Sequence, residues 1–239
     1  LKQTTKYYKL KQKSMWLIDS SIGRKLIMSI TGVFLVLFLL FHSCMNIVVI
    51  ISPEGYNAIC EFLGANWYAL LGTSVLAAGF VAHILYALYL TSQNMRARGS
   101  ERYAVTASQP GVSWASRNMF ILGCVIFGFL VLHMYNFWFK MQFAELTGIH
   151  TGSFDPANGA AFVQELFANK VYCLVYIVWL VAIWFHLTHG VWSAMQTLGL
   201  NNKTWLPRVK MISNIVATIV VLMFMSIPVY FLLGCGSAC

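Results

Sequence analysis

Four histidines lie inside long apolar segments of this 239-residue chain, where a titratable ring is costly. They are His42, His83, His133 and His186, one in each of four apolar segments. A single histidine in such a segment is often only a hydrogen-bond partner of a carbonyl or hydroxyl on a neighbouring helix. One histidine in each of four segments indicates a shared chemical task, and imidazole nitrogens are common metal ligands.

The positions of the histidines in their segments predict two pairs at two depths. His42 and His133 precede the polar stretches that follow them by 11 and 7 residues, which is about 10–16 Å along a helix. His83 and His186 each lie 16 residues after the start of their segments, which is about 24 Å. Alternate segments run in opposite directions across the bundle, so both distances are measured from the same end. We therefore expect His42 to face His133, and His83 to face His186.

Pairs of imidazoles without carboxylates favour haem over zinc. A zinc ion would usually take further cysteine or carboxylate ligands, but the acidic residues all lie in loops or at helix flanks. They are Asp19, Glu54, Glu61, Glu101, Glu145, Asp155 and Glu165. A haem iron needs only two axial ligands, so each pair predicts one bis-histidine haem b in the apolar bundle. Two haems at two depths would form an electron path across a bilayer, with a lipid-soluble quinone as the natural partner.

Residues around the four histidines are candidates for contacts to these haems. Gly79 lies four residues before His83, and Gly190 lies four residues after His186. There each glycine either leaves room for a flat macrocycle or simply allows close helix contact. Asn46 and Asn136 follow the other two ligands by four and three residues, so their amides can serve a propionate, a quinone or each other. His189, three residues beyond the fourth ligand, competes with it as the ligand or contacts a propionate.

Anionic propionates prefer cationic or hydroxyl partners near a helix end. Near the helix ends closer to His83 and His186, the candidate partners are Arg24, Lys25, Ser29 and Arg117. The alternative for these basic side chains is that they extend to the membrane interface and set topology.

The composition requires membrane-spanning elements to hold these residues. Hydrophobic residues make up 59% of the chain and charged residues 10%, against about a quarter charged in soluble domains. Five apolar runs have the length that a transmembrane helix needs. We therefore expect an all-α membrane protein with helices at about 25–51, 67–94, 117–140, 170–198 and 210–233, the first four forming the haem-binding bundle. A basic segment, 1–24, precedes this domain, and a short tail, 234–239, follows it.

The net charge of +9 indicates orientation and not nucleic-acid binding. Alternate loops hold 14 and 2 of the 16 Lys and Arg residues. The bias of basic residues toward the cytoplasm then predicts a cytoplasmic N-terminus and an external C-terminus in a multi-pass protein. Cys235 and Cys239 would lie on the external, oxidising side, and the sequence leaves open whether they pair.

Four sequence stretches, in order, resemble a known family. They are "SITGVFLVLFLLFH" ending at His42, "AHILYALYL" around His83, "FGFLVLHMY" around His133 and "FHLTHGVWS" around His186. Over residues 20–233 the chain resembles the cytochrome b membrane anchor of succinate dehydrogenases and fumarate reductases, in its single-subunit, five-helix, two-haem form. The resemblance implies that His83 and His186 ligate the haem nearer the catalytic subunits, and that His42 and His133 ligate the outer haem.

The resemblance also implies partners, a substrate and a location. The partners would be an FAD-containing flavoprotein subunit and an iron–sulfur subunit on the cytoplasmic face of a bacterial inner membrane. The quinone would be menaquinone, and the chain itself would hold no catalytic residue for succinate or fumarate. Glu61, or alternatively Glu54, matches an external acid that exchanges protons with quinone in some members; each is otherwise a solvated loop carboxylate.

One position departs from the family pattern, and other functions remain open. Trp184 stands where some fumarate reductases carry a glutamate on a proton route, so that route and the direction of electron flow are left open. The alternatives are a cytochrome b anchor of a hydrogenase or formate dehydrogenase, and a proton channel or transporter with relay histidines. The latter class favours inverted repeats and broken helices, which the sequence does not show.

Overall fold

All regular secondary structure in the part of the chain that the structure describes is helical. The computed structural model describes residues 20–98, 113–149 and 153–235, so most of the basic N-terminal segment, and Cys239, lie outside the described residues. Five helical stretches are long and apolar enough to cross a membrane: Ser21–Ile51, Trp67–Ala97, Met119–Thr147, Lys170–Thr197 and Trp205–Leu232. These helices confirm the predicted all-α membrane fold.

The five stretches are built from the following helices. The first contains α2 (Ser21–Asn46) and α3 (Val48–Ile51), the second is α5 (Trp67–Arg98), and the third contains α7 (Met119–His133), η1 (Met134–Phe143) and α8 (Ala144–Thr147). The fourth and fifth are α10 (Lys170–Thr197) and α11 (Trp205–Leu232). Three shorter helices, α4 (Pro53–Phe62), α6 (Trp114–Arg117) and α9 (Gly159–Ala168), lie at the two ends.

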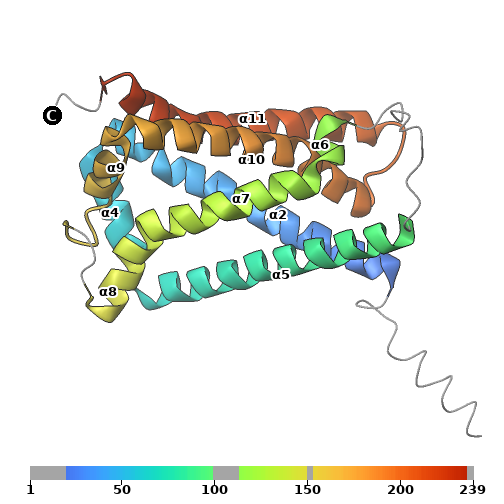
Figure 1. Cartoon of the computed structure of the whole chain (residues 1–239), viewed down its shortest axis with the longest axis horizontal. Coiled ribbons are helices and arrows are strands. Elements are labelled where there is room, and N and C mark those ends of the chain that lie inside the picture. Colours follow the sequence, from blue (N-terminus) through green and yellow to red (C-terminus); the bar gives the residue numbers. More distant parts are fainter. Residues whose placement is uncertain (1–19, 99–112, 150–152, 236–239) are drawn as a thin grey trace, which may run out of the picture.

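The long helices form a bundle in which alternate helices are diagonal to each other. Helix α10 packs against α11, α2 and α7, and α2 also packs against α5. Figure 1 shows α10 and α11 along one side of the bundle, α5 along the opposite side, and α2 and α7 between them. Helix α2 is therefore diagonal to α7, and α5 is diagonal to α10.

Helices α4 and α9 cover one end of the bundle, which we call the α4 end; α6 lies at the other, the α6 end (Figure 1). Ser52 caps α4 by accepting a hydrogen bond from the Gly55 amide at 3.0 Å. Asn57 of α4 donates to Asn158 Oδ1 at 3.0 Å and accepts from the Ala160 amide at 2.9 Å. These bonds join the two short helices into one cover.

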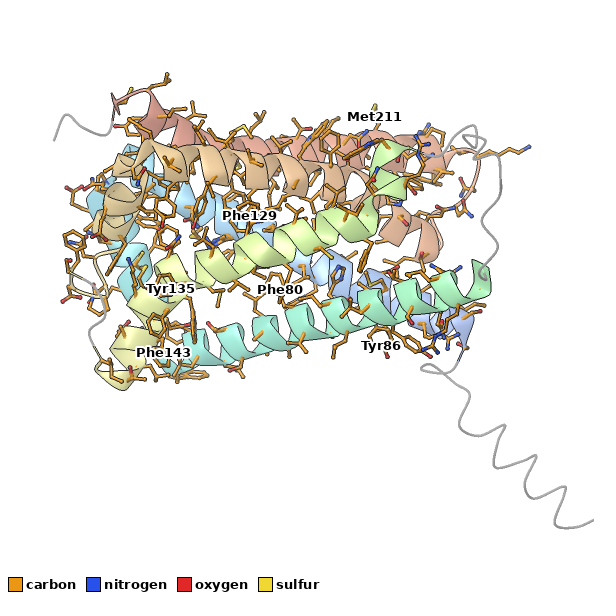
Figure 2. The ribbon with its side chains drawn as sticks, viewed as in Figure 1. Phe80, Tyr86, Phe129, Tyr135, Phe143 and Met211 are labelled. Carbon is orange, nitrogen blue, oxygen red and sulfur yellow. The ribbon has the colours of Figure 1, made fainter. Side chains whose placement is uncertain are left out.

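Burial is concentrated between α10 and α11, and the outer faces are apolar. Cys173, Ala217 and Val220 are almost completely buried. Figure 2 shows Phe129 between α7 and α10, whereas Met211, exposed by 59%, projects from the outer side of α11. Exposed apolar side chains cover all the long helices, as expected for helices whose solvent is lipid.

A π-helical segment interrupts the third long helix. Helix α7 continues after His133 as η1 and then as α8. In an α-helix a residue nine positions after His133 would lie on the opposite face. The wider i→i+5 turn of η1 returns that position, Gln142, to the face of His133. The sequence predicted an ordinary helix at 117–140.

Candidate functional site

The structure brings the four predicted histidines together as two pairs. His42 of α2 and His133 of α7 have ring centroids 6.0 Å apart, with an angle of 87° between the ring planes. His83 of α5 and His186 of α10 have ring centroids 6.5 Å apart, with an angle of 68°. Each pair joins two diagonal helices across the bundle.

Both separations fit two imidazoles that share one metal ion. A metal–nitrogen bond is about 2 Å long, so a metal between two imidazole nitrogens holds the ring centroids roughly 6 Å apart. The ring planes are free to rotate about the nitrogen–metal–nitrogen axis, so steep interplanar angles are compatible with such a centre. Among the described residues no cluster of three or more His, Cys, Asp or Glu side chains is placed to hold a metal. Each pair therefore offers the two axial nitrogens that a haem iron needs.

The Thr31 hydroxyl contacts the ring of His83. The Thr31 hydroxyl donates to the carbonyl of Ile27 at 2.9 Å, and its oxygen lies 3.3 Å from Nδ1 of His83. With the hydroxyl hydrogen on the Ile27 carbonyl, the Thr31 oxygen is available to accept from an Nδ1–H of His83. Nε2 of His83 then carries the free lone pair that ligation requires.

The partner rings on α7 and α10 keep unpaired nitrogens. Nδ1 of His133 and Nδ1 of His186 are buried without a hydrogen-bond partner among the described residues. A buried polar atom without a partner is costly, and costly groups are retained where they have a function. The ring of His133 lies among aromatic rings, with centroids 5.4 Å from Trp179 and 5.1 Å from Phe137.

His42 is held differently, by an amide. Asn46 Nδ2 donates to the His42 carbonyl at 2.8 Å and lies 3.1 Å from Nδ1 of the ring. Tyr56 of α4 donates to Asn46 Oδ1 at 3.1 Å. The Asn46 amide nitrogen also lies 3.4 Å from Nε2, so it borders both ring nitrogens of His42.

The glycines near the deeper pair, His83 and His186, divide between the two expected roles. A Cβ at Gly79 would lie 2.6 Å from Cε1 of Phe34, so Phe34 of α2 fills the space that was expected to receive a macrocycle. A Cβ at Gly190 would meet only Met119, at 3.9 Å. Gly32 of α2, which belongs to the first of the quoted stretches, lies against the His83 ring: a Cβ there would be 3.5 Å from Cε1.

Asn136 and Trp184 point to other partners. Asn136 is buried and donates to the Tyr176 hydroxyl at 3.2 Å, so it does not pair with Asn46. The Trp184 indole donates to Thr218 Oγ1 of α11 at 3.0 Å, away from the histidine pairs. The position of the family glutamate is therefore turned toward the fifth helix.

His189 makes an edge-to-face contact with Trp192 near the α6 end. Its ring centroid is 4.9 Å from that of Trp192, and Nζ of Lys210 lies 4.5 Å from the Trp192 centroid. Nδ1 of His189 is buried without a partner among the described residues.

The four expected propionate contacts gather near the α6 end, with different surroundings. Arg24 donates to the Tyr89 hydroxyl at 3.3 Å and keeps a buried Nε without a described partner. Ser29 is buried and donates to the carbonyl of Lys25 at 2.9 Å, so its hydroxyl hydrogen is already used. Lys25 and Arg117 are exposed.

A cavity of about 150 Å³ lies beside His42 at the α4 end. Neither Glu61 nor Glu54 lines it; both are exposed on α4, and Glu54 accepts from Ser52 Oγ at 3.4 Å. The acid that lines the cavity is Glu145, at the end of the π-interrupted helix, together with Gln142. Neither residue was predicted from the sequence, because the predicted helix ended at residue 140, whereas the helical stretch continues to Thr147.

Two titratable groups on α4 line the same cavity in protonated form. Burial raises the pKa of the Cys60 thiol to about 11. Burial also raises the pKa of the Tyr56 hydroxyl above its usual range. Both side chains are therefore neutral at physiological pH and act there as hydrogen-bonding groups.

The scan against protein-family models found none that matches the chain, and searches of curated proteins and of solved structures found no match. The histidine geometry and the sequence patterns therefore carry the functional argument.

Proposed function

We propose that the chain is a di-haem cytochrome b that anchors a succinate dehydrogenase or fumarate reductase complex and passes electrons between its iron–sulfur subunit and menaquinone. The strongest support is that histidine rings on diagonal helices face each other in two places. The ring centroids are 6.0 Å apart for His42 and His133, and 6.5 Å apart for His83 and His186. A lone structural histidine needs no second ring at that distance. Two such pairs in one bundle match two bis-histidine centres.

Each haem would be held by residues from two helices. His83 and His186 would ligate one, and His42 and His133 the other; bound haem b supplies one-electron redox chemistry. By accepting from Nδ1–H, Thr31 would orient the His83 ring and leave Nε2 unprotonated. Arg24, with its buried and unpaired Nε, is the basic side chain best placed to receive a propionate.

The orientation follows from the distribution of basic residues. The α6 end, which carries most of the Lys and Arg residues in the described part of the chain, would face the cytoplasm of a bacterial cell. A flavoprotein subunit with FAD and an iron–sulfur subunit would dock there, near the deeper pair. The α4 end would face outward, and quinone would enter the cavity beside His42 from the lipid.

An absorbance spectrum and a haem count test this proposal. Purified full-length protein should give a reduced-minus-oxidised difference spectrum of b-type haem, with close to two haems per chain. Purification of the native complex should recover a flavoprotein and an iron–sulfur protein with it. A protein without haem would contradict the proposal, and a haem protein recovered with a hydrogenase or formate dehydrogenase would favour that alternative.

A further inference from the structure

The cavity beside His42 has one wall from α2 and α4 and another from the π-interrupted helix. The first wall carries Phe41, His42, Asn46 and Tyr56, and the second carries Gln142 and Glu145. Glu145 is exposed, whereas Tyr56 is buried, so the cavity runs from the bundle surface inward.

The backbone is shaped to admit the Glu145 carboxylate. A Cβ at Gly64 would collide with Oε2 of Glu145 and lie 3.1 Å from Oε1. Gln142 Nε2 donates to the Gly64 carbonyl at 2.9 Å, which ties the two segments together. The Glu145 carboxylate therefore lies against the backbone of Gly64, beside the cavity.

Most of the other polar groups in the cavity are already paired. Tyr56 donates to Asn46, and Asn46 donates to His42. Gln142 Oε1 accepts from Thr73 and from Trp138, each at 2.9 Å. The Glu145 carboxylate accepts no hydrogen bond from any described residue, so it is the free acceptor of the cavity.

A free carboxylate distinguishes the two redox forms of a quinone. A quinol carries hydroxyl donors, which make charge-assisted hydrogen bonds to a carboxylate. A quinone carries carbonyl acceptors, which a carboxylate repels. Resting on the proposed function, we infer that Glu145, and not Glu61 or Glu54, accepts a hydrogen bond from a hydroxyl of the bound quinol and makes the cavity selective for the reduced form.

Equilibrium binding of two matched probes tests this inference. The full chain, with its haem content recorded, is titrated calorimetrically under dithionite with menadiol, and separately with 1,4-dimethoxy-2-methylnaphthalene, which cannot donate a hydrogen bond. In wild-type protein menadiol should bind more tightly than the ether. Glu145→Gln should weaken menadiol binding about ten-fold and change ether binding less than about two-fold.

Two further variants keep the test decisive. Glu61→Gln, which alters an exposed acid at the same end, should leave both affinities unchanged. Gly64→Ala should displace the carboxylate and reproduce the selective loss, even if Glu145→Gln fails to fold. Equal binding of the two probes by wild-type protein, an unchanged Glu145→Gln variant, or an equal loss in Glu61→Gln would overturn the inference.

The inference and the proposed function fail in different ways. A normal b-type spectrum with no selectivity for menadiol overturns the role of Glu145 alone. Selective menadiol binding that depends on Glu145, in protein that never binds haem, supports that role and contradicts the cytochrome.

Discussion

Replacing Gly79 by alanine should destabilise the α2–α5 contact that holds His83 next to Thr31. A Cβ at this position would lie 2.6 and 2.8 Å from two ring carbons of Phe34, against about 3.5–4.0 Å for an ordinary carbon contact. The ring or the helix must therefore move by about 1 Å. Overpacking of this kind costs about 1–3 kcal/mol.

The same helix supplies a matched control. A Cβ at Gly72 would meet nothing within 4 Å, so Gly72→Ala should stabilise α5 by about 0.5–1 kcal/mol through helix propensity alone. Free energies of unfolding from reversible SDS titration, followed by circular dichroism, should separate the two variants by about 1–3 kcal/mol, because the helix-propensity gain is common to both and cancels. In a Phe34→Ala background Gly79→Ala should lose its cost, a coupling of at least about 1 kcal/mol. An equal cost in both backgrounds would refute the packing argument and favour the earlier expectation that Gly79 leaves room for a macrocycle.

Three other changes test separate parts of the structure. Thr31→Val removes the acceptor of the His83 ring and should lower the free energy of unfolding by about 1 kcal/mol, whereas Thr31→Ser should not; equal stability of the two variants would contradict the assigned bond. Because the pKa of Cys60 is raised to about 11, its alkylation by iodoacetamide should be slow at pH 8 and rise about ten-fold per pH unit toward pH 11. The rate is obtained by subtracting that of Cys60→Ser, and fast labelling at pH 8 would show an unburied thiol. Lys140→Met breaks a 3.9 Å ion pair with Glu165 whose side chains are 24% and 45% exposed, so unfolding should change by less than about 0.5 kcal/mol, and a larger loss would indicate a stronger interaction.

Much of the helical framework could be predicted, because length and hydropathy alone determine which segments can cross a membrane. Because helices are regular, the number of residues between each histidine and the end of its segment predicted which histidines would pair. The structure brings His42 near His133 and His83 near His186, as predicted. Counting along a helix works where the rise per residue is constant.

The details of the site could not be predicted where that regularity fails. The π-helical turn rotates Gln142 and Glu145 toward the cavity, and no apolar pattern marks where such a turn begins. The space at Gly79 is filled by Phe34 from another helix, which sequence spacing along α5 cannot show. Glu61, expected in a loop, lies on helix α4, where its side chain is exposed and does not line the cavity.

Haem stoichiometry in paired variants tests the central proposal most directly. His83→Ala and His186→Ala should each leave about one haem per chain, and the double variant of this pair should lose no more. Combining His83→Ala with His133→Ala, one from each pair, should remove both haems. Four histidine variants that all retain two haems per chain, or a wild-type chain that binds none, would contradict the assignment of the two histidine pairs as haem ligands.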